Sequence, residues 1–235
     1  MRIKGIRHKT IRLRGNIANS LVNFSEHTVS LVAVISDVER GGLPLAGVAF
    51  NSIGRYGQAG IIAERLVPRL LAAAPDSLLD MAGASFDCGK VAACALRNEK
   101  PGGHGDRAAA LGAVELAFWD LNAKLCDEPA YVAIARAFGG DPARHGIPAY
   151  AAGGYYYPQD GLDRLRAELR GYQGDGFGAF KIKIGGASLT EDVARIEAAL
   201  AIAGSGARGR RQWALRTCRG AGLCRGDQAL WVEMV

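Results

Sequence analysis

The stretch FGAFKIKIGG, residues 177–186, constrains the fold of this chain more than any other. Successive side chains of a strand point to opposite faces, so Phe180 and Ile182 share one face, and Lys181 and Lys183 share the other. A glycine pair and then a helical pattern follow this strand. A strand, a short loop and a helix form the repeating unit of parallel α/β folds, whose sheets are covered on both faces. The sequence therefore predicts two lysines on a covered face.

Two interpretations of the lysine pair are open. In the first, the strand lies at an edge or surface and water solvates both ammonium groups. In the second, Lys181 and Lys183 point into a polar cavity, because burying a charge without a partner is costly and such groups gather at functional sites. The flanking β/α pattern favours the second interpretation.

Hydrophobic periodicity predicts the remaining elements. We expect Pro68 to kink the first helix and Asp76 to cap the second. The predicted strands are 2–14, 27–37, 45–51, 147–154 and 178–184, and the predicted helices are 58–73, 76–83, 87–97, 106–126, 160–173 and 190–203. The first three strands predict an antiparallel meander, and the last two strands with their helices predict the start of a parallel β/α series.

Composition limits the class of protein. The apolar fraction of 49% and the charged fraction of 22% are ordinary for a globular chain. The sequence has no apolar run long enough to span a membrane, and its start, MRIKGIRHKTIRLRG, is too charged for a signal peptide. The five cysteines have no metal-ligand spacing and are expected to be small buried residues. These features predict a cytoplasmic protein without a membrane partner.

The net charge of +6 is concentrated at the C-terminus. Residues 204–235 contain six arginines against Asp227 and Glu233, so this tail carries +4. Such a tail could bind nucleic acid in a salt-dependent way. Its only aromatic residues are Trp213 and Trp231, however, so bases have few side chains on which to stack. We therefore expect no nucleic-acid partner.

Several segments in order carry a family resemblance. The helix GAVELAFWDLNAK, the strand and loop IPAYAAGGYYYP, and KIKIGG resemble the enolase superfamily, and the K-x-K strand resembles its mandelate racemase branch. The stretches FNSIGRYGQAG and NEKPGGHGDR are similar to those of the D-tartrate dehydratases. The resemblance extends from residue 1 to about 203.

The resemblance implies an α+β capping domain, residues 1–125, followed by an incomplete (β/α)7β barrel, residues 126–203, of which only the first two β/α units are present. Intact relatives hold Mg²⁺ with an aspartate and two glutamates on the third to fifth barrel strands. The ion stabilises the enediolate formed when a carboxylate loses its α-proton. No residues of this chain match those ligands, so we expect it to bind no metal.

The resemblance also implies roles for five residues. Lys183 is the base that takes the α-proton, and Lys181 contacts the substrate carboxylate and helps to keep Lys183 partly neutral. Asn19, Lys100 and Tyr157 fall at positions of substrate contacts in the dehydratase. Their alternative roles are a loop residue for Asn19, a solvated side chain for Lys100 and packing at the barrel rim for Tyr157.

One position weakens a strict match to D-tartrate. Ile53 stands where the relative has asparagine, which puts one substrate contact in doubt. His104 lies in a glycine-rich loop, where we expect a structural role and not a catalytic one.

The resemblance ends near Ser205, and the tail has neither helical nor strand periodicity. Back-translating from Arg211 with chosen codons and reading one nucleotide later gives ANGRFEPAAGLAYAEAIKRYGLRW. That sequence contains the Asn-Gly element and amphipathic helix of the family's third unit. A frameshift and a genuine basic tail are the two explanations, and genomic DNA around codon 208 would separate them. Either way, we expect the tail to be aberrant or disordered, which would leave the edge of strand 178–184 unpaired.

These observations predict a fragment of a magnesium-dependent acid-sugar dehydratase that is inactive as this chain. The intact enzyme would be a homo-oligomer that converts a small 2,3-dihydroxy acid to a 2-keto acid. One alternative is a racemase or another acid-sugar dehydratase of the same superfamily. The other is a nucleic-acid-binding protein that acts through its arginine-rich tail.

Overall fold

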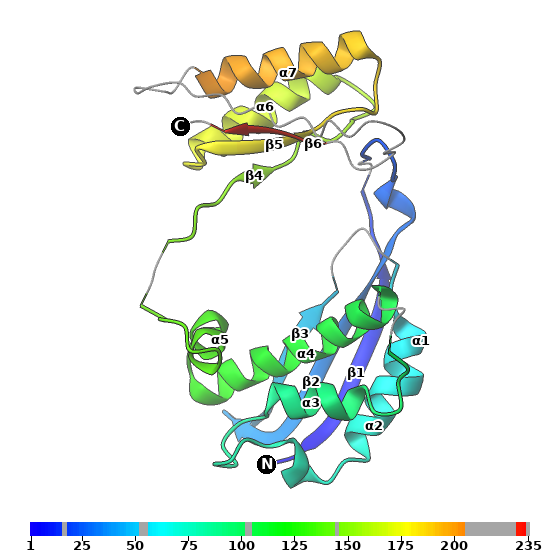
Figure 1. The fold of residues 1–235 in the computed structure, drawn as a ribbon, viewed down its shortest axis with the longest axis vertical. Coiled ribbons are helices and arrows are strands. Elements are labelled where there is room, and N and C mark those ends of the chain that lie inside the picture. The colour runs from blue at the N-terminus through cyan, green and yellow to red at the C-terminus, as the bar shows by residue number, and fades with distance from the viewer. Residues whose placement is uncertain (16–17, 52–55, 102–104, 144–145, 205–228, 234–235) are drawn as a thin grey trace. The chain divides into compact units, whose positions relative to one another are not determined.

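The structure is a computed structural model that describes residues 1–15, 18–51, 56–101, 105–143, 146–204 and 229–233 (Figure 1). The chain forms two compact units. The first unit contains residues 1–13 and 26–145, and the second contains residues 14–25 and 146–235. The short segment 14–25 therefore belongs with the C-terminal half of the chain.

The first unit is built on the predicted antiparallel meander. Strands β1 (Ile3–Arg12), β2 (Thr28–Arg40) and β3 (Leu43–Phe50) pair in that order. Both residues of the β2–β3 turn, Gly41 and Gly42, have positive φ, as a tight hairpin turn requires. Because the turn is tight, β2 extends to Arg40 and β3 begins at Leu43, so both strands are longer at this end than the predicted strands 27–37 and 45–51.

Helix α4 (Gly105–Cys126) covers one face of this sheet (Figure 1). Its apolar stripe includes Val114, Phe118 and Leu121, which are fully buried against Val32 and Val34 of β2 in one core cluster. The alternation of β2 and the helical period of α4 therefore meet in the core that each pattern predicted.

The predicted helix 58–73 is present in three consecutive pieces. These are α1 (Ala59–Ile61), a π-helical turn (Ile62–Leu66) and α2 (Val67–Leu71). Pro68 lies in the first turn of α2, where a missing N–H costs little, and the irregular turn lies directly before it. Helix α3 (Cys88–Ala95) matches the predicted helix 87–97, and Asp87 caps it by accepting a bond from the Lys90 N–H (3.0 Å).

One helix prediction in this unit was wrong, and one helix was missed. The predicted helix 76–83 is only a 3₁₀ turn (Pro75–Leu78), because Asp80 Oδ1 accepts the Ala84 N–H (2.9 Å) and competes with helical bonding. Helix α5 (Ala130–Ala137) was not predicted. It has no fully buried residue, so its sequence pattern was weak.

The second unit contains the predicted β/α series. Its elements are β4 (Ala151–Ala152), α6 (Gly161–Gly174), β5 (Ala179–Lys183) and α7 (Leu189–Gly204). Strand β4 is shorter than predicted, and it pairs in parallel with β5, as a strand–helix–strand crossover requires. A 3₁₀ turn (Phe24–Glu26) begins at the end of segment 14–25.

The core of this unit lies between the sheet and the two helices. Phe180 and Ile182 of β5 are fully buried against Leu165 and Leu169 of α6 and Ala199 of α7. One face of β5 is therefore filled by apolar packing, which leaves its other face for the lysines.

Strand β6 (Ala229–Glu233) corrects the expectation for the tail. It pairs antiparallel with β5, so β5 is the central strand of a sheet ordered β4-β5-β6 (Figure 1). An unpaired strand edge accepts any extended apolar segment, and ALWVE has this character. Residues 205–228 of the tail lie outside the described residues. The described part of this unit is a small sheet with two helices and not a closed barrel.

Candidate active site at the lysine strand

The two lysines of β5 occupy the face opposite its apolar core. Lys181 and Lys183 are half-buried, whereas Phe180 and Ile182 are fully buried. The Nζ of Lys183 lies 5.7 Å from the centre of the Tyr155 ring, within the range of a cation–π contact. The alternation predicted from the sequence is therefore present, and the lysine face is partly covered.

The chain that leaves β4 runs beside the lysines. The Gly153 N–H donates to the Lys181 carbonyl (3.0 Å), and the Lys183 N–H donates to the Gly154 carbonyl (3.2 Å). Gly154 has φ +60°, and a Cβ there would come within 2.7 Å of Ile182 Cγ2. Only glycine fits this position, because both the backbone conformation and the contact with β5 exclude a side chain.

Tyr157 lies on the segment that follows these glycines. Its hydroxyl donates to Glu168 Oε2 (3.0 Å), and the Arg164 guanidinium lies 3.9 Å from its ring centre. Burial, followed by the negative charge of Glu168, raises the pKa of Tyr157 to about 12. The hydroxyl is therefore protonated at neutral pH and is engaged with a carboxylate of α6.

Asn19 lies in segment 14–25 and so belongs to the same unit as the lysine strand. Its Oδ1 accepts the N–H groups of Leu21 (2.9 Å) and Val22 (2.7 Å). This is the side-chain turn typical of asparagine, and it uses the acceptor oxygen to shape the loop. The neighbouring Ala18 forms a bridge with Tyr156.

Lys100 lies in the first unit, so the structure brings only four of the five predicted site residues into one unit. Its side chain is exposed, and its carbonyl accepts a bond from Arg107 Nη1 (2.7 Å). Ile53 and His104 lie outside the described residues.

The residue before Lys100 holds three arginines. Glu99 pairs with Arg65, with Arg69 (2.8 Å) and with Arg107 (3.2 Å), and its side chain is only 10% exposed. These bonds, led by those from Arg65 and Arg69, lower the pKa of Glu99 to about 2. The cluster joins the start of the Lys100 loop to α4 through Arg107, and to the π-helical turn and α2 through Arg65 and Arg69.

The Glu99 cluster should resist acid. Because the pKa is lowered in the folded state, its stabilising contribution is complete above the ordinary value near 4.5 and is lost as pH falls through about 2. We expect Glu99→Gln to lower the melting temperature equally at pH 7 and pH 5. The difference from wild type should shrink only below pH 4.5. Glu39→Gln, an exposed control on β2, should change little at any pH. A Glu99→Gln effect that vanished by pH 5 would contradict the assignment.

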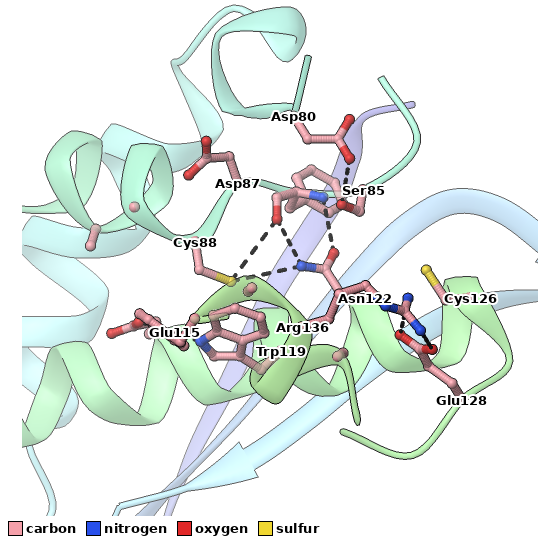
Figure 2. Close-up of a pocket in the computed structure, with 16 residues that line it drawn as sticks. Asp80, Ser85, Asp87, Cys88, Glu115, Trp119, Asn122, Cys126, Glu128 and Arg136 are labelled. Atoms are coloured by element: carbon pink, nitrogen blue, oxygen red, sulfur yellow. Dashed lines mark hydrogen bonds and ion pairs between the residues drawn. The ribbon is translucent and has the colours of Figure 1, made fainter. Parts of the chain in front are cut away.

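A cavity with a volume of about 590 Å³ lies in the first unit, between α3, α4 and α5 (Figure 2). Asn122 accepts the Phe86 N–H (2.9 Å) and donates to the Phe86 carbonyl (2.7 Å), and Arg136 pairs with Glu128. Burial raises the pKa of the Cys88 thiol to about 12, so it is not a nucleophile at neutral pH. These polar groups hold the first unit together and form no reactive set.

The expectation of buried cysteines holds at one position and fails at another. Cys88 is buried as expected, but Cys126 is exposed, so the expectation of buried cysteines was wrong there. Within the described ranges, no three His, Cys, Asp or Glu side chains gather as a metal site requires. Among those same residues, no helix has the length and apolar character needed to cross a bilayer.

Sequence reasoning missed four polar residues around the lysine strand, namely Tyr156, Glu168, Asp192 and Arg195. One signal was available for two of them. Asp192 and Arg195 are buried on the same face of α7 as Ala199 and Ile202, at spacings of three and four residues. Charged residues on an apolar helical stripe indicate a buried polar contact.

Comparisons with known proteins place this geometry in context. No family model matches the sequence. A stretch of 103 residues is 34% identical to the arabinonate dehydratase of Saccharolobus solfataricus, and it covers 44% of this chain and 26% of that protein.

Solved structures match a larger part of the chain. A mandelate racemase/muconate lactonizing enzyme-like protein from Rubrobacter xylanophilus has a TM-score of 0.59 and 23% identity, covering 86% of this chain and 50% of that one. A mandelate racemase/muconate lactonizing enzyme from a marine actinobacterium, in complex with magnesium, has a TM-score of 0.53 and 25% identity, and the match covers 86% of this chain and 49% of that one. The L-Ala-D/L-Glu epimerase from Bacillus subtilis has a TM-score of 0.58 and 21% identity, and the match covers 87% of this chain and 51% of that one.

The matched part is about half the length of these solved proteins and about a quarter of the curated relative. Because the matches cover 86–87% of this chain, they include parts of both compact units. This chain has the fold of mandelate racemase/muconate lactonizing enzyme-like proteins over about half of their length.

Proposed function

We propose that this chain is the capping part and the first barrel units of an enolase-superfamily enzyme that removes the α-proton of a small hydroxy acid. The observation that carries the proposal is the position of Lys181 and Lys183, half-buried on the non-core face of a strand in a parallel β/α unit. In this proposal, residues 1–125 are the capping domain and residues 126–203 are the start of the barrel.

Acid-sugar dehydration is the reaction that we favour. The curated relative is an arabinonate dehydratase, and an aldonate is an acid sugar with neighbouring hydroxyl groups. The D-tartrate dehydratase resemblance of the stretches at 50–60 and 98–107 points to the same class of small 2,3-dihydroxy acid. The finer choice between a tartrate and an aldonate is part of the proposal.

The residues of this chain would perform two tasks. Lys183 Nζ accepts the α-proton of the substrate, and the ammonium of Lys181 pairs with its carboxylate. The β-hydroxyl then leaves as water with a proton from solvent or from the protonated Lys183, and the resulting enol takes up a proton to become the 2-keto acid. Asn19, Lys100 and Tyr157 would contact the substrate hydroxyls, and Tyr157 can act only as a neutral hydroxyl because its pKa is about 12.

The family resemblance is the reason to consider magnesium. Three of the solved proteins with this fold were determined with bound magnesium. In such sites the ion supplies positive charge against the developing enediolate. The described residues of this chain do not fit the ion, since they contain no cluster of three carboxylate, histidine or cysteine ligands. We therefore assign no step to a metal on this chain.

An activity prediction follows for the chain as it stands. We expect no measurable 2-keto acid from any tartrate isomer or arabinonate, with or without added Mg²⁺, because the described residues offer no ligand set to hold the ion near Lys183. A coupled reduction of the 2-keto acid product measures this directly. Magnesium-dependent turnover by the pure 235-residue protein would refute the prediction.

Racemisation or epimerisation is a second candidate. It is favoured by structures of the same fold, which include an N-succinyl Arg/Lys racemase and the L-Ala-D/L-Glu epimerase. The test uses a version of this chain completed to a full barrel and incubated with hydroxy acids in D₂O. Dehydration gives a 2-keto acid, whereas racemisation incorporates deuterium at the α-carbon without loss of water. If no acid sugar gives either a 2-keto acid or deuterium at the α-carbon, the proposed function is rejected.

Three further parts of the proposal concern the whole protein. The partner is a small dihydroxy acid, the completed enzyme is a homo-oligomer, and the tail after about residue 205 arises from a frameshift. Genomic DNA around codon 208 tests the last of these. If no alternative frame downstream encodes further β/α units, the frameshift explanation fails.

A further inference from the structure

A single buried arginine joins the ends of two strand segments in the second unit. Arg195 of α7 is only 5% exposed. Its Nη2 donates to the Gly154 carbonyl after β4 and to the Lys183 carbonyl at the end of β5 (3.3 Å). An apolar residue at position 195 would complete the helical stripe at lower desolvation cost. The particular property of arginine here is that one planar group places Nη2 at both carbonyls and Nε 3.9 Å from Asp192 Oδ1.

Tyr156 and Asp192 hold the loop after β5. The Tyr156 hydroxyl donates to Asp192 Oδ1 (2.7 Å) and accepts the Gly186 N–H (2.9 Å). Asp192 Oδ2 accepts the Gly185 N–H (2.6 Å). Arg195 lies 4.5 Å from the centre of the Tyr156 ring, and its Nε is 3.9 Å from Asp192 Oδ1. The three side chains therefore form one connected, largely buried group.

The same group reaches the loop that carries Asn19. The Tyr156 N–H donates to the Ala18 carbonyl (3.1 Å), and these two residues form an antiparallel bridge. Tyr156, which lies on the segment after β4, thus contacts the glycine loop after β5, helix α7 and segment 14–25.

We propose that Tyr156, Asp192 and Arg195 are positioning residues that hold Lys183, Tyr157 and the Asn19 loop in one fixed geometry. The inference rests on the proposed function, because a fixed Lys183 side chain matters only if it meets a substrate. None of the three side chains is assigned a contact with the reacting atoms.

The first test is hydrogen exchange on the full 235-residue chain. Tyr156→Phe removes one oxygen and is the variant least expected to disturb folding. We expect exchange of the Gly186 amide to become about fivefold to tenfold faster, because its acceptor is lost. Asp192→Asn should accelerate the Gly185 amide by at least about tenfold, since a bond to a charged acceptor is stronger.

The second test asks whether the network reaches the lysine side chain. The ¹³Cε and Nζ resonances of Lys183 should shift in Tyr156→Phe, Asp192→Asn and Arg195→Met, with melting temperature as the check on folding. Arg195→Lys keeps the charge but lacks the planar group that places Nη2 at the carbonyls and Nε beside Asp192 together, so it should restore the resonances only in part. A network that served stability alone would leave the Lys183 side-chain signals unchanged in folded variants, and that result would overturn the inference.

Matched controls separate local from general effects. Glu191→Gln removes the carboxylate next to Asp192, and Tyr150→Phe removes a hydroxyl from an exposed tyrosine of the same unit. Neither should alter Gly185, Gly186 or Lys183, and a shift as large as that of Tyr156→Phe would contradict the inference. Turnover of a completed barrel that survives Lys183→Ala would reject the proposed function and leave these exchange results standing.

Discussion

Replacing Lys183 by alanine in a version completed to a full barrel is expected to abolish both turnover and exchange of the substrate α-proton. A positioned general base contributes about 10²- to 10⁴-fold to the rate, and no second base is assigned on this face of β5. Deuterium incorporation measured by NMR and 2-keto acid formation measured by a coupled assay follow the two events separately. Wild-type rates in Lys183→Ala would overturn the assignment of the strand.

The neighbouring lysine should behave differently from Lys183. Lys181→Ala is expected to raise KM and to move the rising limb of the pH–rate profile to higher pH, because Lys183 loses a nearby cation that favours its neutral form. Lys9→Ala is a suitable control, since Lys9 is an exposed residue of β1. Exposed substitutions of this kind change stability by no more than about 0.5 kcal/mol. If Lys183→Ala, Lys181→Ala and Lys9→Ala all have the same kinetics, the result would support a solvated surface pair instead.

The largest effect on stability is expected from Gly47→Ala in β3. A Cβ at this position would lie 1.9 Å from the Ala117 carbonyl oxygen and 2.5 Å from the Leu121 nitrogen of α4. Both are backbone atoms of a packed helix, so they cannot rotate away, and β3 must separate from α4. Overpacking costs about 1–3 kcal/mol and occasionally more, and we expect at least the upper end of this range.

Urea denaturation of the first unit measures this cost, and Gly112→Ala provides a control of opposite sign. Gly112 lies within α4, and a Cβ there meets no atom within 4 Å. Alanine in a helix interior is more favourable than glycine by about 1 kcal/mol, so Gly112→Ala should stabilise the same unit. A Gly47→Ala variant as stable as wild type would show that β3 and α4 are not in backbone contact.

Local patterns in the sequence predicted most of the elements. The period-two alternation of β2 and β5 and the helical period of α4 appear in the structure as buried and exposed faces. The parallel pairing of β4 with β5 followed from the helix between them. These predictions succeeded because each depends on neighbours in the chain, whose spacing determines which side chains share a face.

Other features depended on residues far apart in the chain. Strand β6 paired with β5 from a tail in which we predicted no strand. Segment 14–25 joined the second unit although it follows β1 directly. Each outcome was decided by hydrogen bonds to distant partners, which no local window of sequence contains.

The candidate site divides in the same way. The sequence alone determined that Lys181 and Lys183 share one strand face, because alternation follows from the strand itself. Only the tertiary structure decided that Arg195 joins the carbonyls of Gly154 and Lys183, which are 41 and 12 residues away from it. The physical reason is that a buried hydrogen bond depends on where the acceptor lies in space, and folding brings together acceptors that the chain order keeps apart.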